Sequence, residues 1–220
     1  MISGKTIGAI AANLAAMSFI IGFALYFTVL KDANYARLDL PHLSQLQFLI
    51  KNQSLMHFWY LIIYVFFGTA LALLCLVLHQ RLYPESPLMT SLASVFGLVW
   101  VGLVVASGLV VTTGNRHVIE VYPQDRGQAV DLWLVVQVVT NALGGGNEII
   151  GGLWIFLISL AALQSKGLSK TLGLSGLVIG SAGVLTIIPA WEVLAAVFGF
   201  GCILWFGGLS ALWFSEQRHD

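Results

Sequence analysis

The sequence predicts an all-helical fold, a bundle of six transmembrane helices that forms a single domain over residues 1–220. Hydrophobic residues make up 58% of the chain and charged residues only 9%, against about 25% in soluble domains. Ten acids balance ten bases, so the basic excess that nucleic-acid binding requires is missing. This composition excludes a soluble enzyme, a disordered tail and a nucleic-acid-binding protein. It predicts a polytopic protein whose principal partner is the lipid bilayer.

Six apolar runs are each long enough to cross the hydrocarbon, which takes about 20 helical residues. The predicted spans cover residues 7–30, 55–78, 88–111, 130–163, 168–188 and 190–214. The first apolar run is longer than the roughly 7–15 residues of a cleaved signal peptide, so we expect it to remain as a helix. Pro189 cannot continue the fifth helix and therefore marks the turn into the sixth.

The segments that connect the first to the second span and the third to the fourth span have patterns that predict their structure. After the first span, Leu43, Leu46 and Ile50 recur at helical spacing. This predicts a short helix on the membrane surface, with a soluble loop as the equal alternative. Residues 115–128, which contain Pro123, are expected to form irregular structure between the third and fourth spans.

The fourth apolar stretch is too long for a simple span. Residues 130–163 would make a helix of about 50 Å at 1.5 Å per residue. The helix must therefore be long and protruding, or broken. The obvious break is at three consecutive glycines, which are Gly144, Gly145 and Gly146. Asn147 would then cap a second half-helix with Glu148 in its first turn, where the helix dipole favours a negative charge.

Polar residues gather on this fourth stretch and form the predicted ligand-binding site. Gln137, Asn141, Gly144 and Glu148 recur three or four residues apart, on one stripe of a continuous helix, and Asn147 precedes the glutamate. A charge at mid-membrane costs about 2.5–3.5 kcal/mol on insertion scales, so an acid there predicts a functional site. The alternative is a polar clamp that only joins helices.

Loop character and glycine spacing give weaker signals. The segment 164–171 is short and carries Lys166 and Lys170 without an acid, which favours the cytoplasmic side and places both termini there. Gly176 and Gly180 form a GxxxG pair. Such pairs let helices approach closely, here either within the bundle or at a homodimer face.

Three histidines, His42, His57 and His117, are expected near the outer boundary, in the neighbourhood of Glu120 and Asp131. Two histidines from different helices, such as His57 and His117, can hold a haem iron axially. Three nitrogens, or two nitrogens with a carboxylate, can hold a transition metal. No spacing in the sequence requires either group, and interfacial polar side chains are the simpler interpretation.

A short motif carries a resemblance. The run 144–152, GGGNEIIGG, continues as Leu153 and Trp154, and a glycine-rich span ending in IIP follows. The chain resembles a group of uncharacterised bacterial six-helix integral membrane proteins, which are classed as a domain of unknown function. The resemblance implies a multi-pass protein of the bacterial inner (plasma) membrane and implies no activity.

The leading functional hypothesis is a binding or accessory protein rather than an enzyme, since no nucleotide-binding loop or hydrolase motif is present. Its intramembrane polar pocket around Glu148 would hold a small lipophilic or ionic ligand, or a proton. One alternative is a redox or electron-transfer subunit with haem or a metal on the outer histidines. Another is a structural subunit of a larger membrane complex, and a homo-oligomer is also compatible with the sequence.

Overall fold

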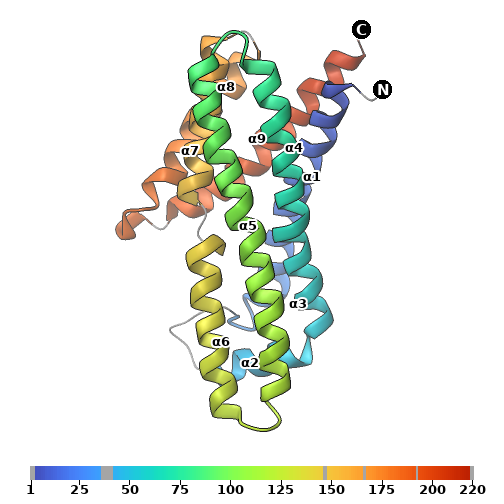
Figure 1. Ribbon diagram of the computed structural model, residues 1–220, viewed down its shortest axis with the longest axis vertical. Helices are drawn as coiled ribbons and strands as arrows, with labels where there is room; N and C mark the ends of the chain where they lie inside the picture. Colours follow the sequence, from blue (N-terminus) through green and yellow to red (C-terminus); the bar gives the residue numbers. More distant parts are fainter. Residues whose placement is uncertain (1–2, 36–41, 146–147, 166, 192, 219–220) are drawn as a thin grey trace. The chain divides into compact units, whose positions relative to one another are not determined.

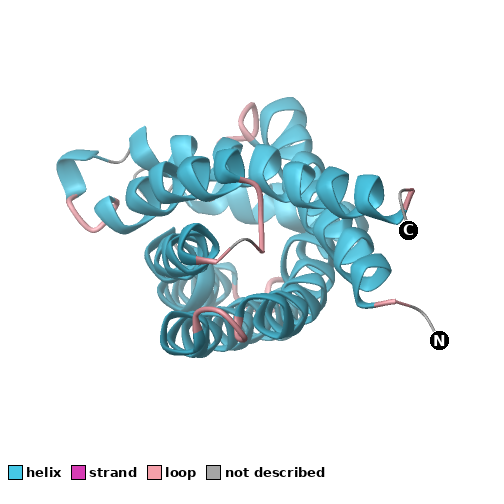
Figure 2. Cartoon of the chain, turned by 90° about the horizontal axis from the view of Figure 1, so that it is seen from above, coloured by secondary structure: helices cyan, strands magenta, loops and turns pink. Residues whose placement is uncertain are grey.

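The computed structural model describes residues 3–35, 42–145, 148–165, 167–191 and 193–218. Every regular element in these ranges is a helix, which confirms the predicted all-helical class (Figures 1 and 2). The chain divides into two compact units. The first unit comprises the described residues of Met1–Phe19, Phe66–Gly102 and Asn147–Asp220, and the second comprises those of Ile20–Val65 and Leu103–Gly146. The single domain over residues 1–220 stays a prediction.

Nine α-helices follow one another along the described chain. They are α1 (Gly4–Leu25), α2 (His42–Lys51), α3 (Gln53–Tyr60), α4 (Phe67–Leu82), α5 (Pro87–Val121), α6 (Arg126–Thr140), α7 (Glu148–Gln164), α8 (Lys170–Leu185) and α9 (Val193–Gln217). π-Helical segments follow α1, α3 and α6. They are η1 (Tyr26–Leu30), η2 (Leu61–Phe66) and η3 (Asn141–Gly145).

Among the described residues, five helical stretches are long and apolar enough to cross a membrane. They are Gly4–Leu30, Gln53–Leu82, Pro87–Val121, Arg126–Gln164 and Val193–Gln217. They match five of the predicted spans, so the chain is a multi-pass helical membrane protein. In the fourth stretch, α6 and η3 lie on one side of residues 146–147 and α7 begins on the other. Gly146 lies outside the described residues, and the expected break there stays a prediction.

The predicted span at 168–188 is the exception. The structure gives an apolar helix only over Lys170–Leu185, 16 residues long. At 1.5 Å per residue it extends about 24 Å, less than the hydrocarbon thickness. The helix begins where the Ser169 hydroxyl accepts a hydrogen bond from the Leu172 amide at 3.3 Å, and a short 3₁₀ turn over Pro189–Trp191 follows its end. A sixth crossing by this helix stays a prediction.

A helix is present where the short surface helix was predicted; it is α2, which packs against α6 within the second unit, and its place on the membrane surface stays a prediction. Its buried side chains are Gln45, Leu46 and Leu49, whereas Leu43 is exposed. Hydrophobic spacing therefore predicted the helix, but a buried amide replaces one of the expected apolar contacts.

The prediction of irregular structure over 115–128 is wrong. α5 continues to Val121 and α6 begins at Arg126, so only a short turn separates them. The Asp125 carboxylate accepts a hydrogen bond from the Gln128 amide at 3.0 Å and caps α6. The apolar run ends near Val111, but polar residues can continue a helix, and the extension packs on α6 through the glycine at Gly114.

In the first unit, glycines bring α7 and α8 together backbone to backbone. A Cβ on Gly180 would lie 2.6 Å from the backbone nitrogen of Phe156, and one on Gly152 would lie 2.6 Å from the carbonyl oxygen of Gly180. No side chain fits in such a gap. Gly176 likewise faces Ser159 of α7. The GxxxG pair Gly176 and Gly180 therefore packs inside the bundle, which was one of the two predicted alternatives.

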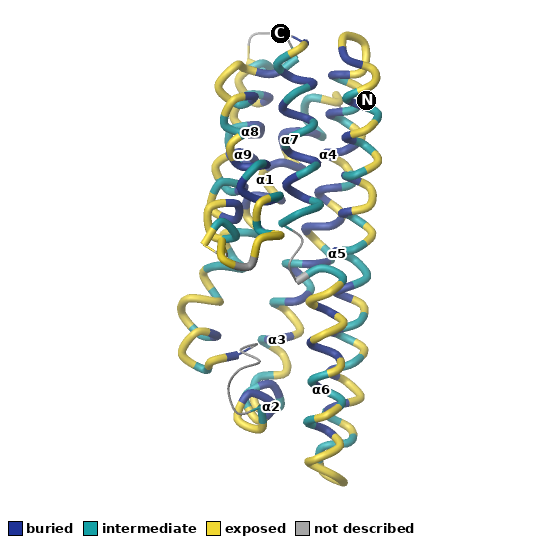
Figure 3. Tube along the Cα trace, turned by 90° about the vertical axis from the view of Figure 1, so that its left-hand side faces the viewer, coloured by how far each residue is buried: buried dark blue, intermediate teal, exposed yellow. Residues whose placement is uncertain are grey.

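The centre of the first unit is an aromatic cluster around Trp154, which is fully buried. The ring centroid of Trp154 lies 5.8 Å from those of Trp100 and Trp205 and 6.4 Å from that of Phe206. Figure 3 shows buried residues along α7, which carries this tryptophan. The cluster joins α5, α7 and α9.

At one end of this unit, charged side chains form hydrogen bonds and ion pairs between different segments of the chain. Arg81 at the end of α4 donates two hydrogen bonds to the Glu216 carboxylate, at 2.6 and 2.9 Å, and a third to the Gly167 carbonyl. Lys5 lies 4.0 Å from the same carboxylate. The interaction thus connects α1, α4, α9 and the α7–α8 loop.

This paired geometry should give a measurable coupling. We expect Arg81→Met and Glu216→Gln to be non-additive by about 1–2 kcal/mol in a double-mutant cycle, because both side chains are mostly shielded and the contact is bidentate. Thermal unfolding of the four proteins in one detergent measures this. Additive effects would show that the ion pair contributes nothing to stability.

Candidate functional site

Glu148, the predicted centre of the site, is the first described residue of α7 and lies in its first turn, as expected. It is half-buried in the first unit. Its carbonyl oxygen would lie 2.5 Å from a Cβ on Gly183, so α8 packs directly against this turn. Its carboxyl group also interacts electrostatically with the buried thiol of Cys202 on α9. An acid in these surroundings can hold a cation or a proton.

The other predicted ligand-binding residues have different environments. Gln137 on α6 is 3% exposed, and its Nε2 has no hydrogen-bond partner among the described residues. Asn141, at the start of η3, is exposed. Both belong to the second unit and Glu148 to the first, whereas Asn147 lies outside the described residues. The joint site of these four residues stays a prediction.

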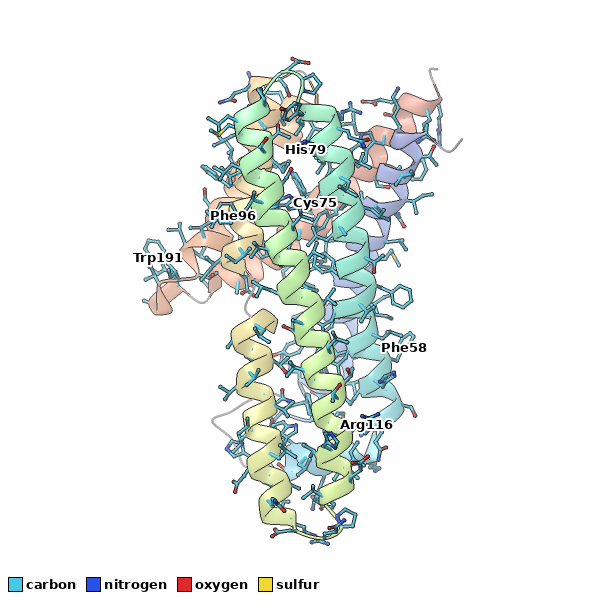
Figure 4. All side chains as sticks on the ribbon, viewed as in Figure 1. Phe58, Cys75, His79, Phe96, Arg116 and Trp191 are labelled. Atoms are coloured by element: carbon cyan, nitrogen blue, oxygen red, sulfur yellow. The ribbon has the colours of Figure 1, made fainter. Side chains whose placement is uncertain are left out.

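The second unit contains an open groove of about 800 Å³. One wall comes from α3 and the adjoining ends of α2 and η2, and the other from the last third of α5. Phe58 of α3 and Arg116 of α5 mark these walls in Figure 4. The lining combines apolar side chains with amide, hydroxyl, imidazole and charged groups, which is the composition of a site for an amphipathic molecule.

The buried side of the groove is polar and neutral. The Tyr60 and Tyr35 hydroxyls hydrogen-bond at 2.9 Å, and both residues are buried. Burial raises the pKa of the Tyr35 phenol above its ordinary value, so this group is a neutral hydroxyl at physiological pH. Asn115 is only 6% exposed, and its Oδ1 has no hydrogen-bond partner among the described residues. This oxygen is enclosed by protein atoms, so the polar groups accessible from the groove are those of its rim.

The rim of the groove is charged. Arg116 and Glu120 are exposed on successive turns of α5, and His57 is exposed on α3. The Glu120 carboxylate lies 3.1 Å from Nδ1 of His117. His57 and Glu120, which were expected in one neighbourhood, both line this groove, and their place at the outer membrane boundary stays a prediction.

The predicted metal ligands His42 and His117 have other neighbours in the structure. The His42 ring lies 6.1 Å from the Trp133 ring, centroid to centroid, and His117 pairs with Glu120. Within the part of the chain that the structure describes, no three His, Cys, Asp or Glu side chains lie close enough to hold a metal ion. A haem or metal site on His42, His57 and His117 stays a prediction.

Sequence reasoning missed two residues of the groove, Asn115 and Arg116, because it placed them in an irregular loop. A signal for them was present. Thr112, Asn115, Arg116 and Ile119 recur three and four residues apart, which is the spacing of one helix face. Continuing the helix past the end of the apolar run would have exposed this face.

The fold and the apolar helices define a class, the multi-pass helical membrane proteins. Comparison of the chain with protein-family models, curated proteins and solved structures gives no match. The resemblance to uncharacterised bacterial six-helix membrane proteins therefore stays a prediction.

Proposed function

We propose that the chain is a non-enzymatic binding or accessory protein of a bacterial inner membrane, which holds a small lipophilic or ionic ligand, or a proton, at Glu148. The observation that carries this proposal is the position of that acid. Other acids within the long apolar stretches, Glu120, Asp131 and Glu216, lie near a stretch's end, whereas Glu148 lies well inside Arg126–Gln164.

The surroundings of Glu148 support a binding role. Glu148 lies in the first turn of α7, where the helix dipole favours a carboxylate. The neighbouring Cys202 and the glycine-packed α8 contribute no positive charge. A bound cation or proton would provide the missing compensation.

Topology is part of the same proposal. Six crossings, with α8 as the short one, place both termini on the cytoplasmic side. The lysine-bearing connection between α7 and α8 then faces the cytoplasm, as the distribution of basic residues in membrane proteins favours.

Glu148→Gln tests the proposal because it keeps the shape of the side chain and removes its charge. We expect the variant to fold as the wild type does, and to lose a small molecule that native mass spectrometry detects on gently purified wild-type protein. For a proton as ligand, the probe is a lipophilic carbodiimide, which modifies protonated carboxyl groups in apolar surroundings. We expect the adduct on the wild type and none at position 148 of the variant.

Asp131→Asn is the matched control, since Asp131 is an exposed acid on the same apolar stretch. It should retain both the bound molecule and the carbodiimide adduct. If Glu148→Gln behaves as wild type in the binding measurement and wild-type Glu148 resists the carbodiimide, the acid is a polar clamp between helices and the proposal fails.

A further inference from the structure

The groove of the second unit lies at the ends of two apolar stretches. Its residues on α3 follow the start of Gln53–Leu82, and its residues on α5 precede the end of Pro87–Val121. In a membrane these consecutive, oppositely directed helices meet the same surface at these ends. The groove therefore lies at the depth of the lipid headgroups, which flank the roughly 30 Å hydrocarbon core.

Its polar groups match a zwitterion better than an anion or a cation. Arg116 offers a guanidinium, whose planar donors suit a phosphate. Glu120, four residues along the same helix, offers a carboxylate that suits an ammonium group.

Apolar side chains continue the groove along α3 toward the membrane interior. Phe58 is 53% exposed, and Leu61 follows it at the start of η2. An exposed aromatic ring and a leucine beside a charged rim are suited to an acyl chain attached to a polar head. A soluble zwitterion would leave these apolar side chains uncovered.

We propose that this groove binds a phospholipid whose headgroup carries a primary ammonium and a phosphate. The phosphate contacts Arg116, the ammonium donates to Glu120, and an acyl chain lies against Phe58. This site is separate from the one proposed at Glu148, and neither depends on the other.

Discrimination between ammonium types tests the proposal. The delipidated full-length protein is titrated with phosphatidylethanolamine, phosphatidylcholine and phosphatidylglycerol of identical acyl chains, and native mass spectrometry measures binding. We expect phosphatidylethanolamine to bind about tenfold more tightly than phosphatidylcholine, whose quaternary ammonium has no N–H to donate. Arg116→Gln should weaken phosphatidylethanolamine binding by about tenfold, because it removes a charge-assisted hydrogen bond.

Arg126→Gln is the control, an exposed arginine of the same unit that does not line the groove. It should bind phosphatidylethanolamine as the wild type does, and both variants should elute as folded protein in gel filtration. Equal affinities for the three lipids, equal losses in the two arginine variants, or tightest binding of phosphatidylglycerol would overturn the proposal. So would competition by free phosphoethanolamine at the concentrations at which the lipid itself binds.

Discussion

Gly180→Ala is expected to destabilise the first unit by about 3 kcal/mol, near the upper end of the usual cost of overpacking. The added methyl carbon would lie 2.6 Å from the backbone nitrogen of Phe156 and 2.7 Å from the carbonyl oxygen of Gly152. Both neighbours are backbone atoms of α7 and have no rotamer by which to move away. The steric clash can be relieved only if α7 and α8 move apart, and this weakens the packing along the whole contact between the two helices. Thermal unfolding in detergent, followed by circular dichroism, measures the loss.

Gly207→Ala provides the matched control, since Gly207 also lies in a helix of the first unit but has open space where the methyl carbon would stand, with no neighbouring atom within 4 Å. Alanine is about 1 kcal/mol more favourable than glycine in a helix, so this variant should unfold at the same temperature or higher. Similar melting temperatures for the two variants would contradict the close backbone packing of α7 and α8.

Trp154→Ala is expected to cost about 3–5 kcal/mol, the range for truncating a buried aromatic side chain. The indole is 0% exposed and contacts rings from α5 and α9, so its removal leaves a cavity that neighbouring helices cannot fill without moving. We expect most of the variant to be lost during purification, and the remainder to melt well below the wild type. Trp154→Phe should recover part of the difference, because a smaller ring fills part of the cavity.

Trp191→Ala is the comparison, because Trp191 is 45% exposed and stands at the end of the 3₁₀ turn before α9 (Figure 4). Its truncation removes an equal number of atoms without opening a cavity. A melting temperature as low as that of Trp154→Ala would mean that the loss reflects tryptophan content rather than the aromatic cluster.

The all-helical class and the positions of five spans were predictable, because a run of about 20 apolar residues is the signature of a transmembrane helix. Helix ends were less predictable, as α5 shows. Hydropathy falls at Val111, yet the helix continues to Val121, since buried Val118 and the glycine contact at Gly114 hold polar turns against α6. For α8 the error has the opposite direction, because the apolar run continues past the end of the helix. Thr186 and the apolar residues after it have a composition typical of a membrane helix, although α8 ends before them.

The candidate sites divide in the same way. A lone acid such as Glu148 stands out in an apolar sequence, and its first-turn position follows from the glycines before it. The groove does not stand out, because its walls come from residues separated by more than fifty positions along the chain, such as His57 and Glu120. Only the folded structure shows that residues of α3 and α5 line the same groove.

The π-helical segment η2 makes the length of the chain itself a determinant of which faces α3 and α4 present. A π turn accommodates about one residue more than an α-helical turn, and each residue of an α-helix advances the direction of its side chain by about 100°. Deleting a single residue between Leu61 and Phe66 would leave composition and hydropathy almost unchanged. It would nevertheless remove the extra residue that the π turn accommodates, so the segment would return to α-helical hydrogen bonding. Among homologous genes, a one-codon gap here therefore carries more structural meaning than many substitutions.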